Sequence, residues 1–296
     1  MRTYSFVTVD VFTTTRFGGN PLAVFPDAAG MSDAEMQSLA AEFNLSETTF
    51  VLPPEDPAHT ARVRIFTRTR EMPFAGHPNV GTAYVLAQQG RDRNGKLLFE
   101  ELAGLVEIDV ERDASGAPIG ATIAAPQPLS LGPELPVETI AACASLTPAD
   151  IRAGAHKPVG ASLGNPFVIA EVEPSALTRA TPDFPSFRQT VEQTPALNGR
   201  LGLYLYAHAG QGSVQARMFA PLGGTIEDPA TGSAAGPLGA LLLSLSDAPE
   251  LRLDIHQGVV MGRPSLLRVV ARRGADGIRA TIAGQCVPVL RGEAQL

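Results

Sequence analysis

The sequence repeats itself, and this duplication restricts the possible folds more than any other feature of the chain. Residues 19–25 (GNPLAVF) have a counterpart in residues 164–170 (GNPFVIA), and residues 64–77 (RIFTRTREMPFAGH) have one in residues 217–233 (RMFAPLGGTIEDPATGS). Both pairs occur in the same order, and the second copy is longer, so it carries insertions. We therefore predict two homologous domains, 1–128 and 129–296, joined near a stretch that contains Pro and Gly.

Each half is expected to be rich in short strands. Runs of β-branched and aromatic residues predict strands over residues 6–12, 48–52, 61–66, 97–99 and 105–110, at spacings typical of a largely antiparallel sheet. Helices are few. Ser32 and Glu35 form a capping box that predicts a helix to about Phe43, and Thr147 followed by Pro148 predicts the start of another.

Two further helices are expected after the repeated glycines Gly76 and Gly232. Both segments are small and apolar almost all round, which is typical of a helix buried within a layer of sheet and not of one on a surface. The predicted fold class is therefore α+β, with two similar domains, each a barrel-like and mostly antiparallel sheet around a central helix.

Composition argues against several classes of function. The formal net charge is −7 and the basic residues are scattered, so we expect no nucleic-acid partner. No apolar run is long enough to span a membrane and the start lacks a secretory signal, which favours a cytoplasmic protein without a membrane partner. The histidines occur singly, and the cysteines Cys143 and Cys286 lie in apolar surroundings, so we expect no metal, no disulfide and two small core residues.

The starts of the two central helices are candidate binding positions. The first N–H groups of a helix have no intrahelical partners and carry partial positive charge. Gly76 and Gly232 would let a ligand approach that backbone closely, and His77 or Ser233 could add a side-chain donor. A small carboxylate-bearing substrate fits such a site. The alternative is that His77 and Ser233 only cap their helices.

Glu47 and Asp228 are the candidate carboxylates. Glu47 lies between the end of the capped helix and an apolar strand, where burying a charge is costly. Its alternative interpretation is a solvated residue at a helix–strand junction. Asp228 precedes a proline and a helix, a context in which aspartate is often a turn residue.

Five motifs in order across nearly the whole chain resemble the PhzF-like, phenazine-biosynthesis isomerase family. They are found in residues 10–24, 46–51, 73–78, 227–235 and 257–265. The resemblance implies the diaminopimelate-epimerase fold, with the active site between two similar domains. It further implies that Glu47 is the acid/base, that His77 and Asp228 orient the substrate, and that Gly76, Gly232 and Ser233 hold it.

The function expected from this resemblance is a cofactor-independent isomerase, similar to trans-2,3-dihydro-3-hydroxyanthranilate isomerase, in which Glu47 moves a proton on a small carboxylate-bearing substrate. Two alternatives stay open: an epimerase or racemase without catalytic cysteines on the same fold, and a ligand-binding or regulatory protein without activity. Arg68 and Arg70 depart from the family pattern and bear on the choice of substrate. A homodimer is one assembly that the chain could form, and no motif decides the oligomeric state.

Overall fold

A computed structural model describes all 296 residues. The chain forms two compact units, residues 1–124 with 283–296, and residues 125–282. The expected division placed residues 283–296 in the second half. In the structure they belong to the first, because the end of the last strand pairs with β1 along its whole length.

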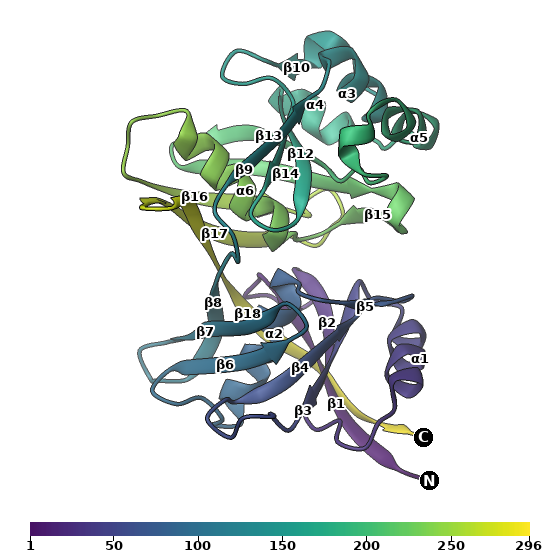
Figure 1. Ribbon diagram of the computed structural model, residues 1–296, viewed down its shortest axis with the longest axis vertical. Helices are drawn as coiled ribbons and strands as arrows, with labels where there is room; N and C mark the ends of the chain where they lie inside the picture. The colour runs from purple at the N-terminus through teal and green to yellow at the C-terminus, as the bar shows by residue number, and fades with distance from the viewer. The chain divides into compact units, whose positions relative to one another are not determined.

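The first unit is a closed barrel of eight strands. Its ribbon is drawn in the lower part of Figure 1. Its strands are β1 (Thr3–Val11), β2 (Asn20–Phe25), β3 (Glu47–Leu52), β4 (Ala61–Phe66), β6 (Lys96–Glu101), β7 (Gly104–Arg112), β8 (Pro118–Ala124) and the end of β18 (Gly277–Gln295). They pair in the order β1-β2-β3-β4-β6-β7-β8-β18, and β18 returns to β1. The pairs β2–β3 and β4–β6 are parallel, and the short strand β5 (Glu71–Met72) pairs antiparallel with β4.

One helix fills this barrel and another covers it. α2 (Gly76–Gln88) is buried along almost its whole length and contacts β1, β2, β3, β7 and β8. It is the central helix that the apolar pattern predicts. α1 (Asp33–Phe43) begins at the Ser32 capping box as expected, and its apolar face packs against the outward-pointing side chains of Phe25, Phe50 and Phe66.

The second unit repeats this plan. Its strands are β9 (Ser130–Glu134), β10 (Ile151–Arg152), β11 (Val159–Ser162), β12 (Pro166–Val172), β13 (Leu203–Gly210), β14 (Ser213–Ala220), β15 (Thr225–Asp228), β16 (Glu250–Gln257), β17 (Ser265–Gly274) and the start of β18. The parallel pairs recur as β12–β13 and β14–β16. The central helix recurs as α6 (Gly232–Ser244), which contacts β11, β12, β16 and β17.

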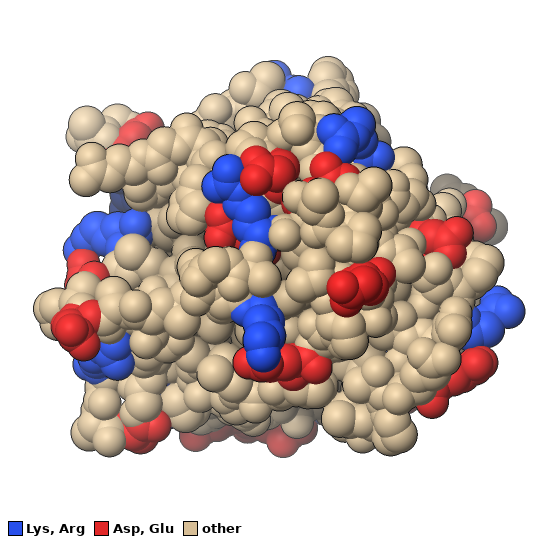
Figure 2. All heavy atoms as spheres, turned by 90° about the horizontal axis from the view of Figure 1, so that it is seen from above, with Lys and Arg blue, Asp and Glu red and all other residues tan.

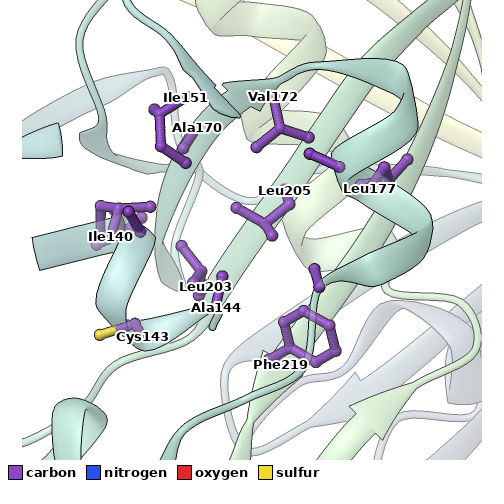
Figure 3. Packing of buried hydrophobic residues seen from close by; sticks show 14 of the residues in the cluster. Ile140, Cys143, Ala144, Ile151, Ala170, Val172, Leu177, Leu203, Leu205 and Phe219 are labelled. Carbon is purple, nitrogen blue, oxygen red and sulfur yellow. The ribbon is translucent and has the colours of Figure 1, made fainter. Parts of the chain in front are cut away.

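Three helices cover the outer face of this second sheet: α3 (Val137–Cys143), α4 (Pro174–Arg179) and α5 (Phe184–Gln193). Figure 3 shows their core, in which Ile140 and Leu177 meet Leu203 and Leu205 of β13. Because side chains alternate along a strand, Tyr204 between these leucines points to the opposite face. Cys143 lies in this core, and Cys286 is also buried and free.

One helix prediction is wrong. Thr147 does form a capping box with Asp150, but only the 3₁₀ turn Pro148–Asp150 follows, and the chain continues as the short strand β10. The box satisfies the first backbone groups of a turn whether or not a helix continues. Here the residues after Arg152 include a glycine and a proline instead of an apolar helical stripe.

The duplication extends to a side-chain interaction. Arg64 makes two hydrogen bonds to the carboxylate of Glu71, each 2.7 Å long, and Arg217 makes two to Glu227, each 2.8 Å long. Each guanidinium also lies over the phenylalanine ring two residues later, 5.1 Å and 4.9 Å from its centre. The extra residues of the second copy form a 3₁₀ turn between β14 and β15.

No helix of the structure has both the length and the hydrophobicity that crossing a membrane requires. On the face seen in Figure 2, basic and acidic side chains are interspersed, and the basic ones form no continuous area.

Candidate active site

In the first unit, Glu47 and His77 lie side by side. Glu47 is the first residue of β3, and His77 is the second residue of α2. His77 Nδ1 is 3.3 Å from Glu47 Oε2, with side-chain exposures of 6% for the histidine and 19% for the glutamate. A partly buried carboxylate in contact with a buried imidazole does not match the interpretation of Glu47 as a solvated junction residue.

His77 is neutral at ordinary pH. Burial lowers its pKa to about 3, and the backbone carbonyl of Pro21, in the repeated GNP segment, opposes this only in part. A neutral imidazole with its hydrogen on Nδ1 can donate to Glu47 without forming an ion pair. Its other nitrogen, Nε2, is buried without a hydrogen-bond partner. His77 does not cap α2, because the cap position is occupied by Ala75.

In the second unit, Asp228 ends β15 and is 7% exposed. The hydroxyl of Thr231 donates to Asp228 Oδ2 at 2.5 Å. Gln257, at the end of β16, donates from Nε2 to the Asp228 carbonyl at 2.7 Å and to Thr231 Oγ1 at 3.0 Å. Its Oε1 accepts from the hydroxyl of Tyr204 at 2.9 Å and from the Thr231 N–H at 3.2 Å. Asp228 is therefore held by a buried network and is more than a turn residue.

Gly76 and Gly232 are the first residues of α2 and α6, two helices of 13 residues each. Ser233, the second residue of α6, occupies the position that His77 has in α2. Neither helix has a side-chain cap, so the capping interpretation fails for both His77 and Ser233. Arg68 and Arg70 lie in the turn between β4 and β5, where Arg70 is exposed.

Sequence reasoning assigned no role to Thr231, Tyr204 or Gln257. The signal for Gln257 was present, because it opens one of the five family motifs. Tyr204 gave no signal, since a tyrosine in an apolar strand is indistinguishable from ordinary core until its partner is known.

The sequence also gave no signal for a buried acid in the first unit, Glu101. Both carboxyl oxygens of Glu101, at the end of β6, are buried without a hydrogen-bond partner, and so are both polar atoms of the Asn79 side chain in α2. Burial raises the pKa of Glu101 to about 8, and the nearby Asn79 amide opposes this in part. Nowhere do three His, Cys, Asp or Glu side chains converge as a metal site would require.

Residues 9–292 match the family model described as phenazine biosynthesis-like protein. The chain belongs to this family. An uncharacterised isomerase of Mesorhizobium japonicum is 38% identical, with 99% of each chain covered. Trans-2,3-dihydro-3-hydroxyanthranilate isomerase of Pseudomonas aeruginosa is 34% identical over 99% of this chain and 100% of its own. The crystal structure of a PhzF-family protein of Bacillus anthracis covers all of both chains, with a TM-score of 0.88 and 26% identity.

These similarities confirm the expected family, the diaminopimelate epimerase-like fold and the prediction of an isomerase. Neither helix-start loop contains a cysteine, and both cysteines are buried elsewhere. A racemase mechanism with two thiols is therefore excluded.

Proposed function

We propose that this protein is a cofactor-independent isomerase that shifts a proton between two carbons of a small, cyclic, carboxylate-bearing substrate. The contact between Glu47 and the neutral, buried His77 carries this proposal. A neutral imidazole positions the glutamate without neutralising it, so Glu47 stays available as a base.

In the proposed reaction, the Glu47 carboxylate removes a proton from a carbon next to the double bond. The electron pair left on that carbon forms a new double bond to the adjacent carbon of the old double bond. The electron pair of the old double bond moves to its other carbon, and Glu47 returns the proton to that carbon. Atoms and electrons balance without an oxidant or a reductant. A positioned acid/base of this kind typically contributes about 10²–10⁴-fold to the rate.

Asp228, Ser233 and the helix starts at Gly76 and Gly232 are proposed to hold and orient the substrate. Helix-start amides suit a carboxylate, because they carry partial positive charge and donate hydrogen bonds. His77 is proposed to orient Glu47 and the substrate.

The strand register favours a proton shift by one base over racemisation by two bases. In the parallel pair β2–β3, Leu22 lies opposite Glu47. The register of β12–β13, continued one residue back, sets Phe167, the counterpart of Leu22, opposite Gly202. The second unit thus has a glycine where the first has its glutamate, and a side chain at Gly202 would meet the Phe167 ring at 2.7 Å.

The test is Glu47→Gln, which keeps the shape of the side chain and removes its ability to carry a proton. With trans-2,3-dihydro-3-hydroxyanthranilate in heavy water, followed by NMR, we expect turnover and deuterium incorporation to fall together by about 10²-fold or more. Binding of 3-hydroxyanthranilate, an aromatic analogue that cannot undergo the shift, should persist in calorimetry.

The matched control is Glu42→Gln, an exposed glutamate on α1 whose replacement should leave the rate unchanged. Full deuterium exchange by Glu47→Gln would exclude the mechanism. Inversion of a stereocentre with the double bond in place would assign the protein as an epimerase. Binding of the analogue without turnover or exchange by the wild-type protein would favour a ligand-binding protein.

A further inference from the structure

The amide of Gln257 is saturated with hydrogen bonds, and their directions are determined. The carbonyl of Asp228 can only accept, so the atom facing it must be the NH₂ group. The N–H of Thr231 can only donate, so the atom facing it must be the amide oxygen. An amide has two hydrogens to give and two lone pairs to receive, and all four are used here.

This orientation fixes the hydroxyl of Thr231 in turn. Because Thr231 Oγ1 accepts from Gln257 Nε2, its own hydrogen is directed to Asp228 Oδ2 at 2.5 Å. The chain of donation therefore runs from Gln257 through Thr231 to the carboxylate. Tyr204 stands at the far end and donates to the Gln257 oxygen, whose position is already fixed by the Asp228 carbonyl and the Thr231 N–H.

The four residues come from four separate segments, so their meeting depends on the fold of the second unit. Tyr204 is on β13, Asp228 ends β15, Thr231 precedes α6 and Gln257 ends β16. All four are buried. The next residue, Gly258, has φ +73°, and a Cβ there would lie 2.6 Å from the carbonyl oxygen of Pro229, so the end of β16 is pressed against the loop that carries Asp228.

We propose that Gln257 and Thr231 are positioning residues that set the orientation of the Asp228 carboxylate, with Tyr204 donating the remaining hydrogen bond to the Gln257 oxygen. The inference rests on the proposed function, because it takes Asp228 as a group that orients the substrate. A carboxylate held by a directed hydrogen bond is already arranged before substrate binds, so binding loses less rotational freedom.

The main test compares Thr231→Val with Thr231→Ser. Valine has nearly the shape of threonine but lacks the hydroxyl, whereas serine keeps it. For trans-2,3-dihydro-3-hydroxyanthranilate we expect KM to rise about tenfold in Thr231→Val with a smaller change in kcat, the size expected for one lost hydrogen bond. Thr231→Ser should restore KM to within about twofold of the wild type.

Thr190→Val is the matched control, because Thr190 is an equally buried threonine of the same unit whose hydroxyl donates to the Ser186 carbonyl on α5. It should lower the melting temperature without changing KM. An equal change of KM in both valine variants, or no change in Thr231→Val, would overturn the inference.

A double-mutant cycle separates this inference from the proposed function. If Thr231 acts through Asp228, then Thr231→Val adds nothing once Asp228→Asn is in place. Additive effects would show that Thr231 acts independently. Should Asp228→Asn itself leave KM unchanged, the proposed role of Asp228 fails, whatever Glu47→Gln shows.

If the wild-type protein binds neither trans-2,3-dihydro-3-hydroxyanthranilate nor 3-hydroxyanthranilate, the proposed substrate class fails. The crystal structure of Thr231→Val then decides the inference by itself. We expect the Asp228 carboxylate to be rotated or disordered there, and a carboxylate in its original position would overturn the inference.

Discussion

The two units place different chemistry at the same position of the same fold. The register shows this at the ends of β6 and β16. Glu101 lies two residues after the strand partner of Ala61, and Gln257 lies two residues after the partner of Val214. Ala61 and Val214 are themselves equivalent, since each lies three residues before the paired arginine of its unit. Glu101 and Gln257 therefore occupy one position of the duplicated plan.

Their surroundings differ sharply. Gln257 makes four hydrogen bonds, whereas the carboxyl oxygens of Glu101 and the amide of Asn79 beside it make none. The second unit thus has a satisfied polar network, which fixes geometry. The first has buried ionisable groups, among them Glu101 and His77, whose pKa values burial shifts away from their ordinary values. Under the proposed function, the second copy orients the substrate and the first transfers the proton.

The largest expected difference concerns the duplicated ion pair. Arg217 is 7% exposed and also donates to the carbonyls of Leu177 and Ala180, whereas Arg64 is 14% exposed and reaches Asp33 at the surface. Removing one partner of a buried pair leaves the other charge uncompensated. We expect Arg217→Met to lower the free energy of unfolding by about 3–5 kcal/mol and Arg64→Met by clearly less. Equal losses in urea denaturation would show that burial does not distinguish the two copies.

A smaller effect, a gain in the free energy of unfolding, is expected for Glu101→Gln. This substitution places in the first unit the glutamine that the second unit has at the equivalent position. The folded-state pKa of Glu101, about 8, lies above its ordinary value of 4.5, so its contribution to stability is present below about pH 4.5 and is lost as the pH rises to 8. Glutamine removes this dependence. Between pH 4.5 and 9, the free energy of unfolding of the variant should exceed that of the wild type by up to a few kcal/mol, since each pKa unit corresponds to about 1.4 kcal/mol.

The neighbouring Glu100 provides the control for that experiment. Backbone N–H groups of Asp56 and Glu55, together with His59, lower its pKa to about 2. Its stabilising contribution is present above pH 4.5 and disappears as the pH falls toward 2. Glu100→Gln should therefore lose stability relative to the wild type at neutral pH, most clearly in thermal denaturation. A wild-type advantage over Glu101→Gln at pH 9 would show that Glu101 has an unrecognised partner.

The smallest effect is expected at His77, whose protonation state should not change with pH over the ordinary range. Because burial holds its pKa near 3, the imidazole should stay neutral from pH 8 down to about pH 4. Nitrogen-15 NMR of labelled histidine should show the His77 ring in its neutral form throughout this range. A protonation step of His77 between pH 5 and 7 would mean that it pairs with Glu47 as a cation, and the division of labour between the units would need revision.

The sequence by itself determined much of this protein. The repeats predicted the duplication, the all-round apolar segments predicted both central helices, and the five motifs predicted the family. These are local signals, because helix caps, strand periodicity and small residues act over a few neighbours. The same locality explains the wrong helix after Thr147, where a genuine capping box is followed by only one turn.

Only the tertiary structure decided which polar groups meet. The sequence gives no indication that Gln257 reaches Tyr204 and Asp228, which lie 53 and 29 residues away along the chain. It does not show that Glu101 is buried without a partner, or that the last strand completes the first barrel. Hydrogen bonds and desolvation depend on distances in space, and those distances are set by strand pairing between segments that are remote in sequence.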